Sequence, residues 1–206
     1  MEKIIDRDAL IEIFNLYQKE EREINNFEFK NIETQNQSNS NIEVTNSKFI
    51  NINLSKSIFN NSFFYNVVFE NCDLSNINFT NSNFKKVTFI NCKLTGTDFT
   101  DTFLENVRIE KSIFNFTNFY AAKQKKVVWN NTNLDNANMQ ENSFLCVSFD
   151  NCSLKEVILF KTNLKGIDLS TSILDGIIID INNLKGAILD YNQLDIVAGL
   201  LHIRIK

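Results

Sequence analysis

The sequence offers little with which to catalyse a reaction. It contains one histidine, His202, in an apolar C-terminal stretch, and it has no glycine-rich phosphate loop. Aspartate and glutamate are scattered along the chain rather than gathered into a motif. A structural role for His202 is therefore the better interpretation. We expect a binding protein rather than an enzyme, with no cofactor and no metal.

Long apolar runs are also absent. No run of about 18 or more apolar residues occurs, so we expect no membrane-spanning segment. The first residues, Met1 to Asp6, lack the basic region and long apolar core of a secretory signal. We therefore expect a cytoplasmic protein whose four cysteines are reduced.

A large excess of either charge is missing as well. The formal net charge is −4 and the isoelectric point is near 5.1. This balance argues against direct binding to nucleic acid phosphates. It suits a basic protein partner, although so modest a charge mainly favours solubility.

Proline is absent and glycine occurs only five times, whereas phenylalanine occurs 19 times. Long asparagine-rich stretches would be compatible with disorder. The phenylalanines, however, lie at a regular interval. From Val44 to Leu194 every fifth residue is large and apolar, and only Gln124 breaks the series. Such a period predicts a repeat architecture.

A period of five fits neither an amphipathic helix nor a long strand. It fits a short extended segment, with two inward side chains two residues apart, followed by a corner. If each five turns through about a right angle, four close a square and a coil takes about 20 residues. Backbone groups would then pair with the coils above and below, about 4.8 Å away.

Sorting the sequence by twenty supports this closure, because similar residues fall into the same column. The first column holds Phe49, Phe69, Phe89, Ile109, Trp129, Phe149, Leu169 and Leu189. The second holds Leu54, Leu74, Leu94, Phe114, Leu134, Leu154, Leu174 and Leu194, and the third Phe59, Phe79, Phe99, Phe119, Met139, Leu159 and Ile179. A period of five alone does not require this sorting, whereas stacking of like on like favours it.

The repeat also resembles a known family. The runs Asn71-Cys72-Asp73-Leu74-Ser75, Asn91-Cys92-Lys93-Leu94-Thr95 and Thr132-Asn133-Leu134-Asp135-Asn136 are similar to those of pentapeptide-repeat proteins. The resemblance implies an all-β solenoid, a right-handed quadrilateral β-helix, which we expect over residues 25–195. Residues 1–24 are expected to form a helical cap, and residues 196–206 a C-terminal capping or dimerisation segment.

At the N-terminus a helical stripe precedes the repeat. It consists of Ala9, Leu10, Ile13, Phe14 and Tyr17, and Asp6 or Asp8 could cap its start. Because solenoid ends need covers, we predict a cap over the first coil; a partner-binding helix is the alternative. Weaker repeats follow, with Phe27, Phe29 and Ile32 as candidate inward residues.

The C-terminal segment is apolar and out of register. It resembles the segment by which quinolone-resistance pentapeptide proteins of the Qnr type dimerise, and an exposed apolar end indicates an interface. We predict a homodimer, with a purely intramolecular cap as the alternative. The residues expected at the interface are Leu194, Ile196, Val197, Leu200, Leu201 and Ile203.

Four inward positions carry a polar or sulfur-bearing side chain and are candidate sites. Cys72, Cys92 and Cys152 occupy small inward positions, so they are best read as core residues rather than converging zinc ligands. Gln124 places an amide at an inward position, which costs about 1–3 kcal/mol if it is unpartnered. We expect a local bulge there, or an amide bonded to neighbouring backbone; a functional loop is the alternative.

Charge is distributed unevenly among the four sides. The side of Gln124 is lysine-rich, with Lys85, Lys86, Lys123, Lys125, Lys126, Lys165 and Lys185. On the side of Trp129, four acids fall in one column at alternate coils: Glu70, Glu110, Asp150 and Asp190. A solvated surface that keeps the protein soluble is the alternative to a partner-binding role.

The family resemblance carries a functional expectation. Qnr-type proteins resemble duplex DNA in width and charge, engage type II topoisomerases and protect them from quinolones. This sequence shares the repeat, the approximate length and the acidic column, which suggests a DNA mimic that binds gyrase or topoisomerase IV and confers fluoroquinolone resistance. It departs in its modest charge, its lysine-rich side and its N-terminal helix. The alternative is a scaffold for an unrelated protein partner.

Overall fold

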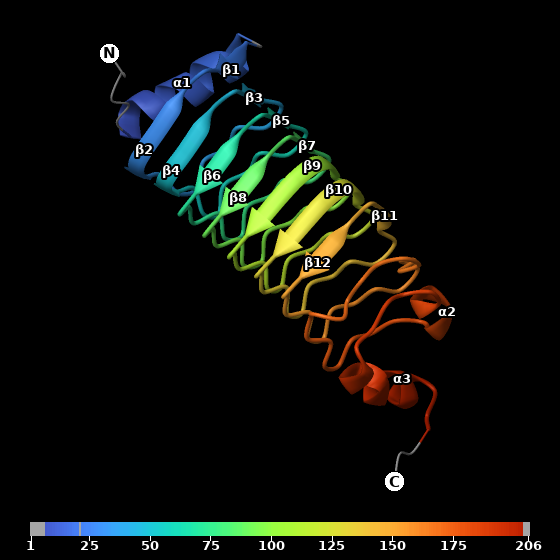
Figure 1. Cartoon of the computed structure of the whole chain (residues 1–206). Helices are drawn as coiled ribbons and strands as arrows, with labels where there is room; N and C mark the ends of the chain where they lie inside the picture. The colour runs from blue at the N-terminus through green and yellow to red at the C-terminus, as the bar shows by residue number, and fades with distance from the viewer. Residues whose placement is uncertain (1–6, 21, 204–206) are drawn as a thin grey trace.

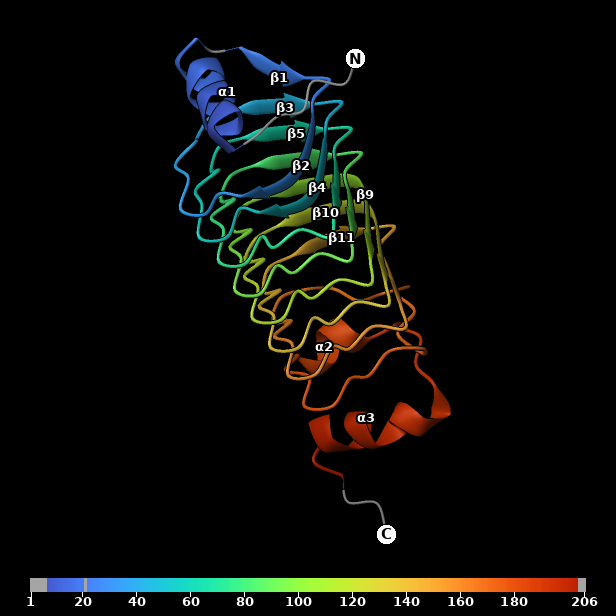
Figure 2. The same ribbon diagram turned by 90° about the vertical axis from the view of Figure 1, so that its left-hand side faces the viewer.

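The chain forms a stack of coils between two helical ends (Figure 1). The computed structural model describes residues 7–20 and 22–203. Helix α1 (Arg7–Lys19) lies over the first coil, while α2 (Ile181–Leu184), a 3-10 helix (Tyr191–Gln193) and α3 (Leu194–Leu200) lie at the other end (Figure 2). No helix within the described ranges is long and apolar enough to cross a membrane.

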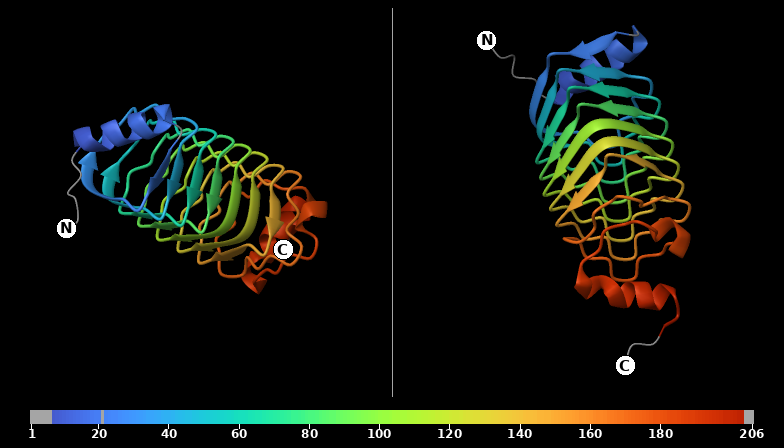
Figure 3. Two further views of the ribbon diagram at one scale, coloured as in Figure 1. Left: turned by 90° about the horizontal axis from the view of Figure 1, so that it is seen from above. Right: turned by 45° about the vertical axis from the view of Figure 1, so that its right-hand side comes forward.

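Short parallel strands form two adjacent sides of the coils. One side consists of β1 (Glu23–Asn25), β3 (Glu43–Thr45), β5 (Phe63–Tyr65), β7 (Asn83–Lys85) and β11 (Ser143–Leu145). The next side consists of β2 (Glu28–Glu33), β4 (Lys48–Asn53), β6 (Val68–Glu70), β8 (Thr88–Ile90) and β12 (Ser148–Asp150). Strands β9 (Phe103–Glu110) and β10 (Lys123–Asn130) bend around the corner and belong to both sides (Figure 3).

The register confirms the predicted coil length. Strand residues pair in parallel with residues twenty positions later, as Phe49 does with Phe69 and Phe69 with Phe89. The other two sides are joined by isolated parallel bridges at the same offset, such as Ile58 with Asn78. Four sides of five residues therefore close each coil, and the predicted all-β solenoid is confirmed.

Aromatic columns fill the centre of the solenoid. The ring centroids of Phe69 and Phe89 lie 5.1 Å apart with planes 7° from parallel, and those of Phe99 and Phe119 lie 4.8 Å apart. These separations are within the range of attractive offset stacking. From Phe49 to Leu184 the inward Phe and Leu residues of the repeat are buried, except Phe144, which is partly buried. Hydrophobic burial along this axis holds the coils together.

Asparagine is frequent because the corners of the coil need residues that adopt a positive φ. The apolar pattern of the sequence does not reveal this requirement. The residue two places after the inward large one has a positive φ, as in Asn71 (54°), Asn91 (52°) and Asn131 (50°). This left-handed conformation costs most L-residues about 1–2 kcal/mol, and asparagine adopts it most readily after glycine. Neighbouring corners also bond to each other, since Asn66 Nδ2 donates to Asn46 Oδ1 at 2.8 Å.

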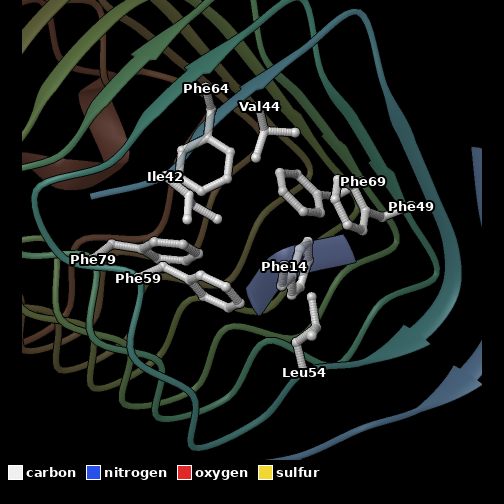
Figure 4. Close-up of a pocket in the computed structure, with 9 residues that line it drawn as sticks. All are labelled: Phe14, Ile42, Val44, Phe49, Leu54, Phe59, Phe64, Phe69 and Phe79. Carbon is white, nitrogen blue, oxygen red and sulfur yellow. The ribbon is translucent and has the colours of Figure 1, made fainter. Parts of the chain in front are cut away.

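The predicted N-terminal helix is present and closes the first coil. Its Leu10 and Phe14 are buried, and the Phe14 ring lies 5.6 Å from that of Phe59. Figure 4 shows Phe14 pointing into the aromatic centre. A space of about 10 Å³ remains there, which is no larger than the volume that one water needs. Asp8 lies inside the first helical turn rather than before it; Asp6, the other candidate cap, lies outside the described residues.

The C-terminal end of the array differs from the prediction. Leu184 is the last buried residue of the apolar inward series, and Leu194 is 48% exposed, so it does not continue the inward column. The reason is Gln193, which is buried in its place. Its Nε2 donates to the carbonyls of Leu169 (3.0 Å) and Ser172 (2.7 Å) and thereby satisfies backbone acceptors of the last coil.

Candidate functional site

The acidic column lies along the outer surface of the side that contains β6 and β12. Glu70 pairs with Ile90, Ile90 with Glu110, and Asn130 with Asp150 in the register. Because β9 and β10 also pair Glu110 with Asn130, the three acids are in one line at alternate coils, roughly 10 Å apart. Arg108 forms an ion pair with Glu110 on the same strand.

Asp190, the fourth predicted acid, differs from the three acids of the column because its carboxylate caps a helix. It lies beyond the last strand, and its carboxylate accepts a hydrogen bond from the backbone N–H of Asn192 at 2.9 Å. It thus caps the 3-10 helix that begins at Tyr191. The structure therefore brings together three of the four predicted acids and gives the fourth a local structural role.

The lysine-rich side is the outer surface of β3, β5, β7 and β11 with the first halves of β9 and β10; we call it the lysine face. Its register aligns Lys85, Glu105 and Lys125 in one column. Lys125 Nζ lies 2.7 Å from one Glu105 oxygen and Lys85 Nζ 3.4 Å from the other. The bond from Lys125 lowers the pKa of the Glu105 carboxyl, so this acid stays ionised between two lysines.

The remaining lysines of this face differ in their surroundings. Lys86 Nζ donates to the Tyr65 hydroxyl at 2.7 Å and lowers the pKa of that phenol. Lys123 and Lys126 are exposed. Lys165 and Lys185 are exposed as well and follow the last strand of the face.

Gln124 corrects a prediction. It is 1% exposed within an unbroken β10, so there is neither a bulge nor a loop. Its amide is bonded to side chains rather than to neighbouring backbone: Gln124 Nε2 donates to Asn142 Oδ1, and Trp129 Nε1 donates to Gln124 Oε1, both at 3.1 Å. Asn142 Nδ2 in turn donates to the Phe119 carbonyl. The glutamine is present because the sole tryptophan brings a buried N–H that needs an acceptor.

The three cysteines predicted at inward positions lie in the core. Cys72, Cys92 and Cys152 are buried, and Cys146 is exposed at a corner. Burial raises the pKa of the Cys152 thiol to about 11 and that of Cys92 well above its ordinary value. Such thiols stay protonated at neutral pH and pack as small apolar groups. No cluster of metal-ligating side chains was found within residues 7–20 and 22–203.

The C-terminal apolar residues divide into two sets. Ile196, Val197 and Leu200 are partly buried and pack against the core. Leu194 and Leu201 are each 48% exposed, and Ile203 is 57% exposed. The segment thus covers the last coil with one face of α3 and presents apolar side chains to solvent with the other.

Comparison with known proteins agrees with the observed coil. Residues 42–119 match the family model described as a pentapeptide repeat region. The chain carries a pentapeptide-repeat region. No curated protein matches the sequence.

Solved structures of pentapeptide-repeat proteins match the chain at low sequence identity. A trypsin-treated variant of QnrB1, a plasmid-mediated fluoroquinolone resistance protein, is 21% identical, with 90% of this chain and 92% of that chain covered and a TM-score of 0.47. Full-length QnrB1 is 22% identical over 88% and 91%, with a TM-score of 0.34. HetL, a pentapeptide repeat protein involved in heterocyst differentiation regulation in the cyanobacterium Nostoc, is 16% identical over 86% and 93%, with a TM-score of 0.37.

Proposed function

We propose that this pentapeptide-repeat chain is a non-enzymatic, cytoplasmic binding protein that engages the DNA-binding surface of a type II topoisomerase. In this proposal it acts as a DNA mimic on gyrase or topoisomerase IV and reduces the effect of fluoroquinolones. The supporting observation is the acidic column, because the parallel register holds Glu70, Glu110 and Asp150 in a line along the β-stack.

The charge density of the column sets an expectation for affinity. Duplex DNA carries about one negative charge per 1.7 Å of its axis, whereas the column offers about one carboxylate per 10 Å. Arg108 partly offsets one of them. We therefore expect topoisomerase binding that is weaker than that of duplex DNA and that falls steeply as the salt concentration rises.

A supercoiling assay with purified gyrase tests the proposal. In low salt the protein should inhibit supercoiling at micromolar concentration, or should restore it in the presence of ciprofloxacin. Replacing Glu70, Glu110 and Asp150 together with lysine should abolish the effect, since it reverses the charge of the column. The control replaces two exposed corner acids elsewhere, Asp101→Lys and Glu156→Lys, and should keep it.

Absence of both inhibition and protection would contradict the proposal. An effect that the column variant and the control variant lose equally would contradict the role of the column. Either outcome would favour the alternative function, a scaffold for an unrelated protein partner.

We further propose that α3 and the residues after it form a homodimer interface. Leu194, Leu201 and Ile203 are each about half exposed at the end of the stack, and clustered exposed apolar side chains indicate association. Light scattering coupled to size-exclusion chromatography should give twice the chain mass, and Leu201→Glu with Ile203→Glu should give a monomer. The control, Ile178→Glu on the side of the stack, should remain a dimer. A wild-type monomer at all concentrations would refute this.

A further inference from the structure

The lysine face differs in charge from the rest of the molecule. Between residues 43 and 195 it carries seven lysines and two acids, Glu43 and Glu105, whereas the other three sides together carry fourteen acids and seven bases. The net charge of −4 therefore describes the whole chain and conceals one strongly basic side. The modest overall charge does not exclude nucleic acid binding at this surface, because binding depends on local charge.

Aromatic rings lie among these lysines on the same surface. Phe63 on β5 and Phe103 on β9 occupy one column, with Asn83 between them, so they are two coils apart. Tyr65 lies beside Phe63, with ring centroids 6.4 Å apart and planes 12° from parallel. All three are half-buried on an outward-facing sheet, which leaves part of each ring open to solvent. Sequence reasoning overlooked them because it sorted this side by charge alone.

The charged groups are arranged next to the rings. Lys86 Nζ lies 4.9 Å from the centroid of the Tyr65 ring. The register pairs Lys123 with Phe103, so Lys123 lies in the same column on the next coil. Lys85 and Lys125 share one carboxylate, Glu105, while no ion pair involves Lys123 or Lys126 in the part of the chain that the structure describes. The lysine face therefore carries more positive charges than its carboxylates neutralise.

We propose that the lysine face binds a single-stranded nucleic acid. Its phosphates would lie along the lysines of the face, and its bases would stack on Phe63, Tyr65 and Phe103. A charged surface that follows the backbone, combined with aromatic side chains that stack on bases, is the general design of single-strand binding sites. The proposal is independent of topoisomerase binding, which uses the adjacent, acidic side.

The rings decide between this ligand and other polyanions. In a duplex the faces of the bases are stacked on one another, so outward aromatic side chains on a flat sheet have nothing to stack on. An acidic polypeptide would use the lysines but would not need rings whose planes are nearly parallel. A preference for single strands over duplex and over polyglutamate therefore follows from the geometry.

Fluorescence anisotropy with labelled probes tests the proposal on the full chain. The probes are oligo(dT) and oligo(U) of about 15 nucleotides, a length near the upper site size of known single-strand binding surfaces, a mixed-sequence duplex of similar length, and polyglutamate. Saturable binding of either single strand, at least about tenfold tighter than duplex and polyglutamate, is expected. Tighter binding of oligo(U) or of oligo(dT) identifies RNA or DNA as the source.

Two pairs of variants locate the site. Lys123→Glu with Lys126→Glu should weaken binding and reduce the dependence of log affinity on log salt by about 1–1.5, because two phosphate contacts are lost. Lys56→Glu with Lys111→Glu is the control, since both are lysine corners with positive φ on other sides. Phe63→Ala with Tyr65→Ala should weaken binding about 30-fold or more, because two stacking platforms are lost, whereas Tyr120→Ala, a half-exposed ring elsewhere, should not.

Circular dichroism melting curves accompany each variant, so that loss of binding is separated from loss of fold. The proposal is overturned by absence of single-strand binding, by equal or tighter binding of duplex or polyglutamate, or by binding that the lysine-face variants leave unchanged. A failed supercoiling assay would not affect it, because the lysine-face variants keep the acidic column.

Discussion

Replacing Phe79 with alanine should lower the free energy of unfolding by about 3–5 kcal/mol. The side chain is 1% exposed, and its ring lies 5.4 Å from that of Phe99 and 6.0 Å from that of Phe59 in the coils on either side. It also meets Phe84 edge-on at 5.2 Å. Truncation removes these contacts and leaves a cavity that stacked backbones cannot close. Urea denaturation monitored by circular dichroism measures the loss.

Two nearby variants calibrate that result. Asn83→Ala changes an exposed strand residue and should cost less than about 0.5 kcal/mol. Asn76→Ala should lie between the two, at about 1 kcal/mol, because Asn76 has a φ of 56° and alanine adopts this region less readily than asparagine. Equal losses at all three positions would contradict the assignment of Phe79 to the core.

Replacing Gln124 with leucine should destabilise the protein by about 1–3 kcal/mol, even though leucine matches the repeat better. The change removes the acceptor of the buried Trp129 N–H and a partner of Asn142. An unsatisfied buried donor carries its full desolvation cost. The measurement is again chemical denaturation, now in a double-mutant cycle.

The second arm of the cycle is Trp129→Phe, which removes the N–H and keeps an aromatic ring. In the double variant the leucine no longer leaves a tryptophan donor unpaired, so a coupling energy of about 1–2 kcal/mol is expected. If Gln124→Leu instead stabilises the chain, or the two effects add, the hydrogen-bonded network does not contribute as described.

The coil could be predicted from the sequence because the packing of the core imposes the same requirement on every repeat. Each inward position must be large and apolar, and the same requirement recurs every five residues, so Phe69 over Phe89 could be anticipated. The N-terminal helix could also be predicted, because Leu10 and Phe14 fall on one helical face. The structure buries both side chains.

Other features depend on single contacts that no period reveals. Gln124 looked like a defect of the repeat because its partners, Trp129 and Asn142, lie on other sides of the coil or in the next coil. Gln193 ends the array although Leu194 fits the pattern, because an amide can satisfy the last carbonyls and a leucine cannot. The corner role of asparagine depends on backbone φ, which the apolar pattern does not encode.

The two charged surfaces lie on adjacent sides of the same stack, joined by β9 and β10 at the corner. Their registers are fixed by the same hydrogen-bond ladder, so each can be altered through outward side chains without disturbing the core. This separation allows the acidic column and the lysine face to be tested one at a time. It also explains why overall charge is a poor guide to either.

Distances between paired spin labels test the twenty-residue coil most directly. Asn60, Thr100, Gln140 and Phe160 should lie in one outward column, and Cys146→Ser removes the exposed native thiol. Labels at 60 and 100, 100 and 160, and 60 and 140 should be separated by two, three and four coils, or about 10, 14 and 19 Å. Distances that increase evenly in this way would agree with a square coil. Distances that fail to rise with the number of coils would contradict it, and with it the charge map of the surface.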